Sequence, residues 1–254
     1  MTIAPERIES RMANSDEPDL DELFELLEHM PVPDGYKVEI VEGTVFMTPQ
    51  RDTHWQTIRR IIRAVEDRFG MDVNVLSDVR IDFPGHRNGF APDVALLSRG
   101  ARKDGLGRWR ARDVEFVAEV ISRGTAHNDY GPKMNAYAQA GVPVYVVADP
   151  YLRRCRVFTR PEGREYKQDC TVEYGEPVDL TGTVVGLVLE TKDFPVEPGR
   201  TAKQDAEQDA PQQGEPQHGG PEREPQQAAQ EEKPQEEKPR EEKPREEKPR
   251  GENG

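Results

Sequence analysis

The chain has 254 residues, and its 49 Asp and Glu residues against 35 Lys and Arg give it a net charge of −14 at pH 7. This balance works against general affinity for nucleic acid, because non-specific binding comes mainly from Lys and Arg at phosphates, although local basic segments can still bind. The two cysteines, Cys155 and Cys170, form no CxxC pair, which excludes the usual spacing of a zinc site.

The first half of the chain predicts two helices and three strands. Residues 19–30 place apolar residues at helical spacing, and prolines follow them. Residues 36–49 are rich in β-branched residues around Glu42-Gly43, which predicts two strands joined by a tight turn. Residues 54–70 predict a second amphipathic helix, and residues 73–82 alternate as a single strand does.

The second half predicts a buried sheet. Residues 91–98 and 115–122 are nearly continuous apolar runs, which are typical of strands buried on both faces. A third helix is expected over residues 129–140 and another buried strand over 142–149. A terminal antiparallel set is expected at residues 153–160, 164–174 and 183–190. This order of elements predicts an α/β fold with a mixed central β-sheet.

The two ends of the chain differ in composition from its middle. Residues 196–254 are dominated by Glu, Gln, Pro and Lys and end in EEKPR-type repeats, so we expect a disordered tail without apolar side chains to bury. We also expect a flexible N-terminus over residues 1–16, which leaves one domain over residues 17–195. The sequence shows no secretory signal pattern and no long apolar run, so we expect a cytoplasmic protein without a membrane segment.

Two basic segments are candidates for contacts with a polyanion. Residues 99–112 hold six basic residues against one acidic residue, and the predicted helix over 54–70 carries a second group: Arg59, Arg60, Arg63 and Arg68. Each segment is equally well explained as a solvated loop or helix face, and the sequence leaves both explanations open.

Two acids in predicted core strands carry the chemical argument. Asp93 and Glu119 each lie among apolar residues, and a buried carboxylate needs a compensating positive charge. If the two strands are neighbours, both carboxylates can share a divalent cation such as Mg²⁺. Asp129, Lys133 and Tyr137 follow one another at helical spacing, so Lys133 could face the same site.

A structural explanation of these residues is also open. Asp93 follows Pro92 and could simply end a turn, and Asp129 with Lys133 could form a surface ion pair between residues four apart. Glu119 fits this explanation less well, because its setting, AEVIS, is strongly apolar.

The ordered set of motifs resembles a known family. Three segments follow one another along the chain: EIVEGTVFMTP, then PDVALL, then EVIS. A set of polar and aromatic residues comes after them. The order resembles the bacterial "putative restriction endonuclease" family of the Uma-two type, within the PD-(D/E)XK nuclease superfamily. The resemblance covers about residues 20–190 and implies a restriction-endonuclease-like fold, in which helices flank a mixed central β-sheet. The residues that complete the order are Thr125, Asp129, Lys133, Tyr137, Gly141, Val142, Tyr145, Asp149 and Pro150, with His54 upstream.

The resemblance also implies a set of catalytic residues. Asp93 and Glu119 would bind Mg²⁺ or Mn²⁺, and Lys133 would take the role of the superfamily's lysine. The chain departs from the wider superfamily at Ile121, where a lysine is usual, so Lys133 would come from the following helix instead. Glu39 matches an acidic position in the first strand of the family and would complete the site.

Four further residues are candidates for support or substrate contact. Asp129 lies one helical turn before Lys133. For His54, contact with phosphate and the start of a helix remain alternatives. Ser122 could hydrogen-bond the metal ligands or cap the next helix. Tyr137 could orient Lys133 or simply pack under its helix.

The sequence therefore leads to one principal hypothesis and two alternatives. The principal one is a Mg²⁺-dependent endonuclease in which a metal-activated water hydrolyses DNA phosphodiester bonds, and the superfamily resemblance admits a homodimer. The first alternative is a catalytically inactive module of the same fold that binds DNA or a protein, which the acidic charge balance favours. The second is a hydrolase of another phosphoester that uses the same site.

Overall fold

The computed structural model describes residues 18–32 and 34–198, and these residues all fall in one compact unit. The predicted N-terminal segment, residues 1–16, lies outside the described residues, as does all but the beginning of the predicted tail from residue 196. The bounds predicted for the domain, 17–195, therefore stay a prediction.

A six-stranded sheet forms the centre of the fold, in the order β11-β10-β9-β8-β6-β3. Strands β8 and β9 are parallel, and every other pair in this sheet is antiparallel. The sheet is therefore mixed, which confirms the predicted α/β class with a mixed central sheet. Its strands are β3 (Val75–Leu76), β6 (Val94–Leu97), β8 (Val114–Val120), β9 (Val144–Asp149), β10 (Arg154–Glu162) and β11 (Glu165–Glu173).

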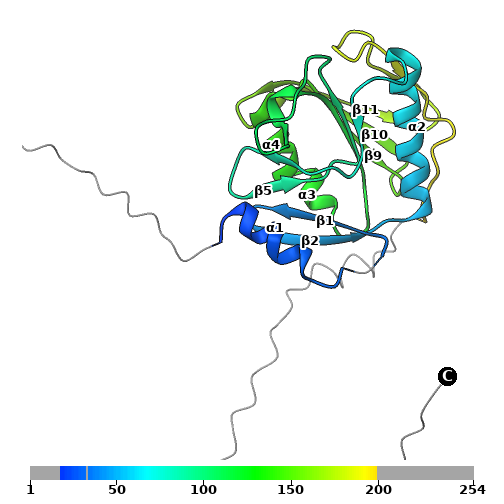
Figure 1. Cartoon of the computed structure of the whole chain (residues 1–254). Coiled ribbons are helices and arrows are strands. Elements are labelled where there is room, and N and C mark those ends of the chain that lie inside the picture. Colours follow the sequence, from blue (N-terminus) through cyan, green and yellow to red (C-terminus); the bar gives the residue numbers. More distant parts are fainter. Residues whose placement is uncertain (1–17, 33, 199–254) are drawn as a thin grey trace, which may run out of the picture. The chain divides into compact units, whose positions relative to one another are not determined.

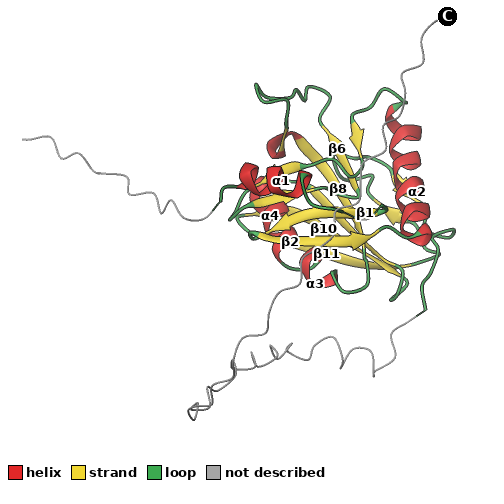
Figure 2. Ribbon diagram, turned by 60° about the horizontal axis from the view of Figure 1, so that its bottom comes forward, coloured by secondary structure: helices red, strands yellow, loops and turns green. Residues whose placement is uncertain are grey.

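A second sheet lies against the first, in the order β2-β1-β5-β4-β7. The predicted hairpin is present, because Glu42 and Gly43 both have positive φ and make the tight turn between β1 and β2. Figure 2 shows this hairpin in front of the larger sheet. The strands are β1 (Tyr36–Val41), β2 (Thr44–Pro49), β4 (Ile81–Phe83), β5 (Asn88–Phe90) and β7 (Trp109–Arg110), which a short 3-10 helix, η1 (Ala111–Asp113), follows.

The helices cover both faces of the central sheet. Helix α2 (Asp52–Phe69) packs on one face, where it meets Val94 and Leu96 of β6. Helix α4 (Pro132–Ala140) packs on the other face, which Ala95 and Leu97 enter. The alternation along β6 explains its continuous apolar run, since both faces of the strand are buried. Figure 1 shows α2 and α4 on opposite sides of the sheet.

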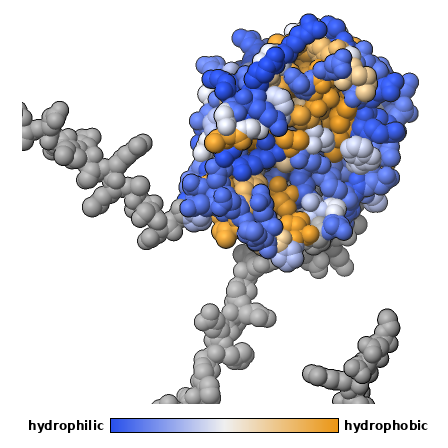
Figure 3. Space-filling view, in the orientation of Figure 1, coloured by the Kyte–Doolittle hydropathy of each residue, from blue (hydrophilic) through white to orange (hydrophobic). Residues whose placement is uncertain are grey.

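The first helix, α1 (Leu20–Glu28), begins at a capping box in which Asp19 and Glu22 each bond the other's backbone amide. Its Phe24 ring lies under the guanidinium of Arg80, 3.8 Å from ring centre to Cζ, which ties α1 to the second sheet. No helix among residues 18–32 and 34–198 is both long and apolar enough to cross a membrane. Hydrophilic residues make up most of the face seen in Figure 3, with smaller apolar patches between them.

Three predicted elements were wrong in their extent. The single helix over 129–140 is two helices, α3 (Ala126–Asp129) and α4, because Pro132 has no amide hydrogen and disfavours a helical conformation at the residue before it. The single strand over 73–82 is divided between β3 and β4, which belong to different sheets. The strand over 183–190 is reduced to β13 (Val188–Leu189), which pairs with β12 (Val178–Asp179).

Candidate active site

The pairing of β6 with β8 brings Asp93 and Glu119 together. Val94 lies opposite Ala118 and Ala95 opposite Val117, so the same antiparallel register continued by one residue places Asp93 beside Glu119. The backbone N–H of Asp93 lies 3.3 Å from Glu119 Oε2, to which it donates. Both residues are 1% exposed. Two acids that are 26 residues apart in the chain are thus neighbours in the core.

Three donors hold the carboxylate of Asp93. Its Oδ1 accepts a hydrogen bond of 2.6 Å from Lys37 Nζ. Its Oδ2 lies 2.7 Å from the Val120 amide nitrogen, which donates, and 2.9 Å from His54 Nε2. Burial by itself would raise the pKa of Asp93, but the nearby Lys37 and His54 outweigh it and lower that pKa below its usual value. Asp93 is therefore a firmly ionised acid.

Glu119 is held on the other side of the site. Its Oε1 lies 2.6 Å from Lys133 Nζ and accepts a hydrogen bond from the Tyr137 hydroxyl. Burial, together with repulsion from Asp93 and Glu39, raises the pKa of Glu119 to about 8, although both lysines oppose the rise. Two acids side by side thus titrate far apart, as interacting buried carboxylates do.

Lys133 connects three carboxylates. Besides Glu119, its Nζ lies 3.2 Å from Glu39 and 3.1 Å from Asp129. Burial opposes its charge, but the three acids raise the pKa of Lys133 well above the usual value. Asp129 reaches it although α3 and α4 are separate helices. Glu39 also accepts a hydrogen bond of 2.9 Å from the Ala91 amide, which fixes β1 against the segment between β5 and β6.

The site as a whole holds more acidic than basic side chains. Its four buried carboxylates, Glu39, Asp93, Glu119 and Asp129, face two buried ammonium groups, Lys37 and Lys133, which leaves two negative charges when every acid is ionised and His54 is neutral. Oxygen donors with this charge suit a hard divalent cation. In the present geometry, however, the described residues contain no group of three or more His, Cys, Asp or Glu side chains arranged to hold a metal ion.

Every residue predicted for the site is placed in or beside it. Asp93, Glu119, Lys133 and Glu39 form the charged centre, and Asp129, Tyr137 and His54 contact that centre directly. The hydroxyl of Ser122 lies 3.3 Å from His54 Nδ1, one contact further out. These positions bring the residues together, while their catalytic and metal-binding roles stay predictions.

Sequence reasoning missed Lys37. This residue is on β1, two positions before Glu39, and successive odd positions of a strand point to the same side. The alternation was visible in YKVEIV, because Lys37 and Glu39 are the charged residues of an otherwise apolar strand. A buried lysine could therefore have been predicted once Glu39 was placed in the site.

One basic segment has a structural role. Arg108, in the segment 99–112, donates hydrogen bonds to Asp21 of α1 and Asp82 of β4, at 2.8 and 3.5 Å. These hydrogen bonds hold α1 against β4 of the second sheet. On α2, Arg59, Arg63 and Arg68 are exposed. They contact Gln56, Asp67 and the Gly186 carbonyl, so both explanations of this helix face, solvation and contact with a polyanion, stay open.

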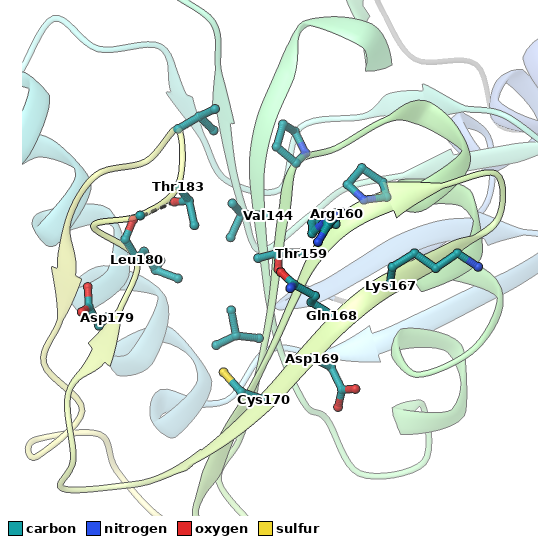
Figure 4. Close-up of a pocket in the computed structure, with 15 residues that line it drawn as sticks. Val144, Thr159, Arg160, Lys167, Gln168, Asp169, Cys170, Asp179, Leu180 and Thr183 are labelled. Atoms are coloured by element: carbon teal, nitrogen blue, oxygen red, sulfur yellow. Dashed lines mark hydrogen bonds between the residues drawn. The ribbon is translucent and has the colours of Figure 1, made fainter.

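A separate hollow of about 950 Å³ lies between β10, β11 and the segment 179–184. Figure 4 shows Thr159, Gln168 and Cys170 along the strands and Asp179, Leu180 and Thr183 on the facing segment. No buried ionisable side chain of the described residues lines it. This hollow therefore offers no buried acid or base for catalysis.

Comparisons with known proteins identify the family and the fold of this chain. The family model Uma2, described as "Putative restriction endonuclease", matches residues 21–192. A crystal structure of "a putative nuclease belonging to DUF820" from Anabaena variabilis is similar to this chain, with 15% sequence identity and a TM-score of 0.54 over 70% of this chain and 97% of that one. At this identity the likeness shows the fold alone, and it confirms the predicted nuclease-like architecture. A search of curated proteins finds no match.

Proposed function

The chain belongs to the Uma2 family of "Putative restriction endonuclease" proteins, and from its buried acid–lysine site we propose that it is a divalent-metal-dependent endonuclease that hydrolyses DNA phosphodiester bonds. The observation that carries the proposal is the meeting of Asp93, immediately before β6, with Glu119 of the neighbouring β8, and Lys133 Nζ lies 2.6 Å from Glu119. Acids and a lysine that converge from three elements are what a phosphoryl-transfer site requires.

The donor set fits a divalent cation. Asp93 and Glu119 would hold it, and once Glu119 gives up its proton the cluster has more carboxylates than ammonium groups, which suits a divalent cation. Mg²⁺ and Mn²⁺ both favour carboxylate oxygen ligands. A cation bound there would supply a water of lowered pKa and neutralise charge on the scissile phosphate.

The residues of the chain supply orientation and positive charge. Lys133 places an ammonium group beside Glu119, where it can attract a phosphate oxygen as negative charge grows on the phosphate. The Tyr137 hydroxyl fixes the rotamer of Glu119, and the Val120 amide together with His54 fixes that of Asp93. Ser122 in turn contacts the outer nitrogen of the His54 ring. These contacts hold both acids in place before any substrate arrives.

One observation favours the second candidate, a catalytically inactive module of the same fold. The described acids already have protein partners, because Lys37 and His54 take up Asp93 while Lys133 and Tyr137 take up Glu119. Such a cluster could act as a structural ion network, and a net charge of −14 weakens general affinity for DNA. A homodimer and the cytoplasmic location expected from the sequence are compatible with either candidate.

Plasmid cleavage tests the proposal. Purified full-length protein is incubated with supercoiled DNA and Mg²⁺ or Mn²⁺, beside the variants Glu119→Gln and Asp93→Asn. We expect each variant to lose activity by at least about 100-fold, because one well-placed electrostatic group contributes that much to a rate. Glu115→Gln is the matched control, because Glu115 lies on the same strand but outside the site. This variant should cleave DNA as the wild type does. Equal nicking by all four proteins would show contamination and refute the proposed activity.

A further inference from the structure

Lys37 occupies the place between the two acids that are expected to bind the metal. Its Nζ lies 2.6 Å from Asp93 Oδ1, 3.8 Å from Glu119 Oε2 and 3.7 Å from Glu39 Oε2. Lys133, the other lysine of the cluster, pairs with Glu39, Glu119 and Asp129. Among the described lysines, therefore, Lys37 is the one whose ammonium bridges Asp93 and Glu119.

Lys37 covers the oxygen of Asp93 that is available to bind a metal ion. Oδ2 of Asp93 is bound by the backbone amide of Val120 and by His54, which itself contacts Ser122. A backbone donor inside a central strand cannot move away without breaking the sheet. Oδ1, by contrast, accepts its hydrogen bond among the described residues from Lys37, whose donor is the end of a flexible side chain. A cation bound to Asp93 would thus use Oδ1, in the place of the ammonium.

The space at the site points the same way. The cavity that Lys37, Asp93, Glu119 and Lys133 line together has a volume of about 10 Å³, which is close to the least that holds one water molecule. A Mg²⁺ ion needs about six oxygens around it, including several waters and a phosphate oxygen. With Lys37 in place, the space between the two acids is therefore smaller than an ion with its shell occupies.

Lys37 is the group best placed to leave. It comes from β1 of the outer hairpin, where it pairs with Thr48 of β2. Glu119 and Lys133 belong to the central sheet and to α4, and Asp93 immediately precedes β6 of that sheet. Its four-carbon stem can rotate without a change in the backbone.

We propose that Lys37 is a resident counter-cation: its ammonium occupies the position of the divalent cation between Asp93 and Glu119, and metal binds only when that ammonium swings away. This inference rests on the proposed function, because it assumes that Asp93 and Glu119 are metal ligands. It assigns to the β1–β2 hairpin a regulatory role over the site, in addition to its structural one.

Calorimetric titration of full-length protein with Mn²⁺, without DNA, tests the inference. Lys37→Met removes the ammonium, and we expect it to bind Mn²⁺ at least about 10-fold more tightly than the wild type. Lys133→Met is the matched control, because it removes the same charge from the same cluster but leaves Asp93 Oδ1 covered. We expect a smaller gain in that variant. Lys37→Arg keeps a cation in place and should bind no more tightly than the wild type.

The results of this titration distinguish the role of Lys37 from the existence of the metal site. If Lys37→Met binds Mn²⁺ no better than the wild type, while Asp93→Asn abolishes binding, the metal site stands and the role of Lys37 is refuted. An equal gain in Lys133→Met, or in Lys37→Arg, also refutes it, since charge or packing alone would then explain the effect. If neither the wild type nor Lys37→Met binds Mn²⁺, the metal site itself fails and the proposed function with it.

A thermal unfolding measurement covers the risk that Lys37→Met is poorly folded. Loss of the lysine leaves a buried carboxylate without its partner, so the variant should melt at a lower temperature than the wild type in the absence of metal. A ligand that binds more tightly stabilises the folded state more at the same concentration. Mn²⁺ should therefore raise the melting temperature of the variant more than that of the wild type. An equal or smaller rise would contradict the proposal.

Discussion

Raising the pH from about 5 to about 8 in metal-free buffer should weaken the folded state of this protein through Glu119. The pKa of this acid rises from its ordinary value of 4.5 to about 8 in the folded protein, chiefly because it is buried. The folded state therefore keeps a proton that the unfolded chain has already lost. Stability supplied by that proton is fully present below pH 4.5 and is lost as the pH rises through about 8.

The size of this effect follows from the shift. One pKa unit corresponds to about 1.4 kcal/mol, so between pH 5 and pH 8 the free energy of unfolding should fall by roughly 3 kcal/mol. Asp93 does not change the free energy of unfolding in this window, because its pKa is lowered and it titrates only under more acidic conditions. Asp129, whose pKa burial raises, acts in the same direction as Glu119.

Glu119→Gln isolates the contribution of this one group. The amide resembles the protonated acid, and its oxygen can still accept from Tyr137 and Lys133. We therefore expect the variant to be at least as stable as the wild type near pH 8 and to show a much flatter pH dependence, with the slope that Asp129 leaves. Urea unfolding across the pH range, with EDTA present, measures both curves. Identical slopes in the two proteins would show that Glu119 does not hold the proton, and the protonation state argued for this acid would be wrong.

Two further predictions concern the attachment of α1. Arg108→Gln breaks the half-exposed ion pair with Asp21 and should lower stability by at most about 1 kcal/mol, while the salt dependence of any DNA binding stays unchanged; a reduced salt slope would instead make Arg108 a DNA contact. Gly89→Ala should lower the melting temperature by several degrees, since a β-carbon there would clash with the Phe24 ring. Gly100→Ala, where a β-carbon meets nothing, is the control, and equal melting of both variants would contradict the packing argument.

Much of this protein could be predicted from local patterns in the sequence. Strands were predicted correctly at the β1–β2 hairpin, β6, β8 and β9. A strand buried on one face alternates apolar and polar residues, and a strand buried on both faces is apolar throughout. The acids of the site were found for the same reason: Glu119 stands in an apolar strand, where an unpaired charge is costly. Patterns of this kind depend on each residue's own environment.

Other features depend on partners that are distant in the chain, and sequence alone did not reveal them. The sequence did not show that β3 and β4 enter different sheets, because strand pairing is set by tertiary contacts. Nor did it show that Lys37, from a hairpin 56 residues before Asp93, would lie on that acid's free oxygen. Burial can be read one residue at a time, whereas an ion pair exists only once the fold has brought both charges together and removed water from between them.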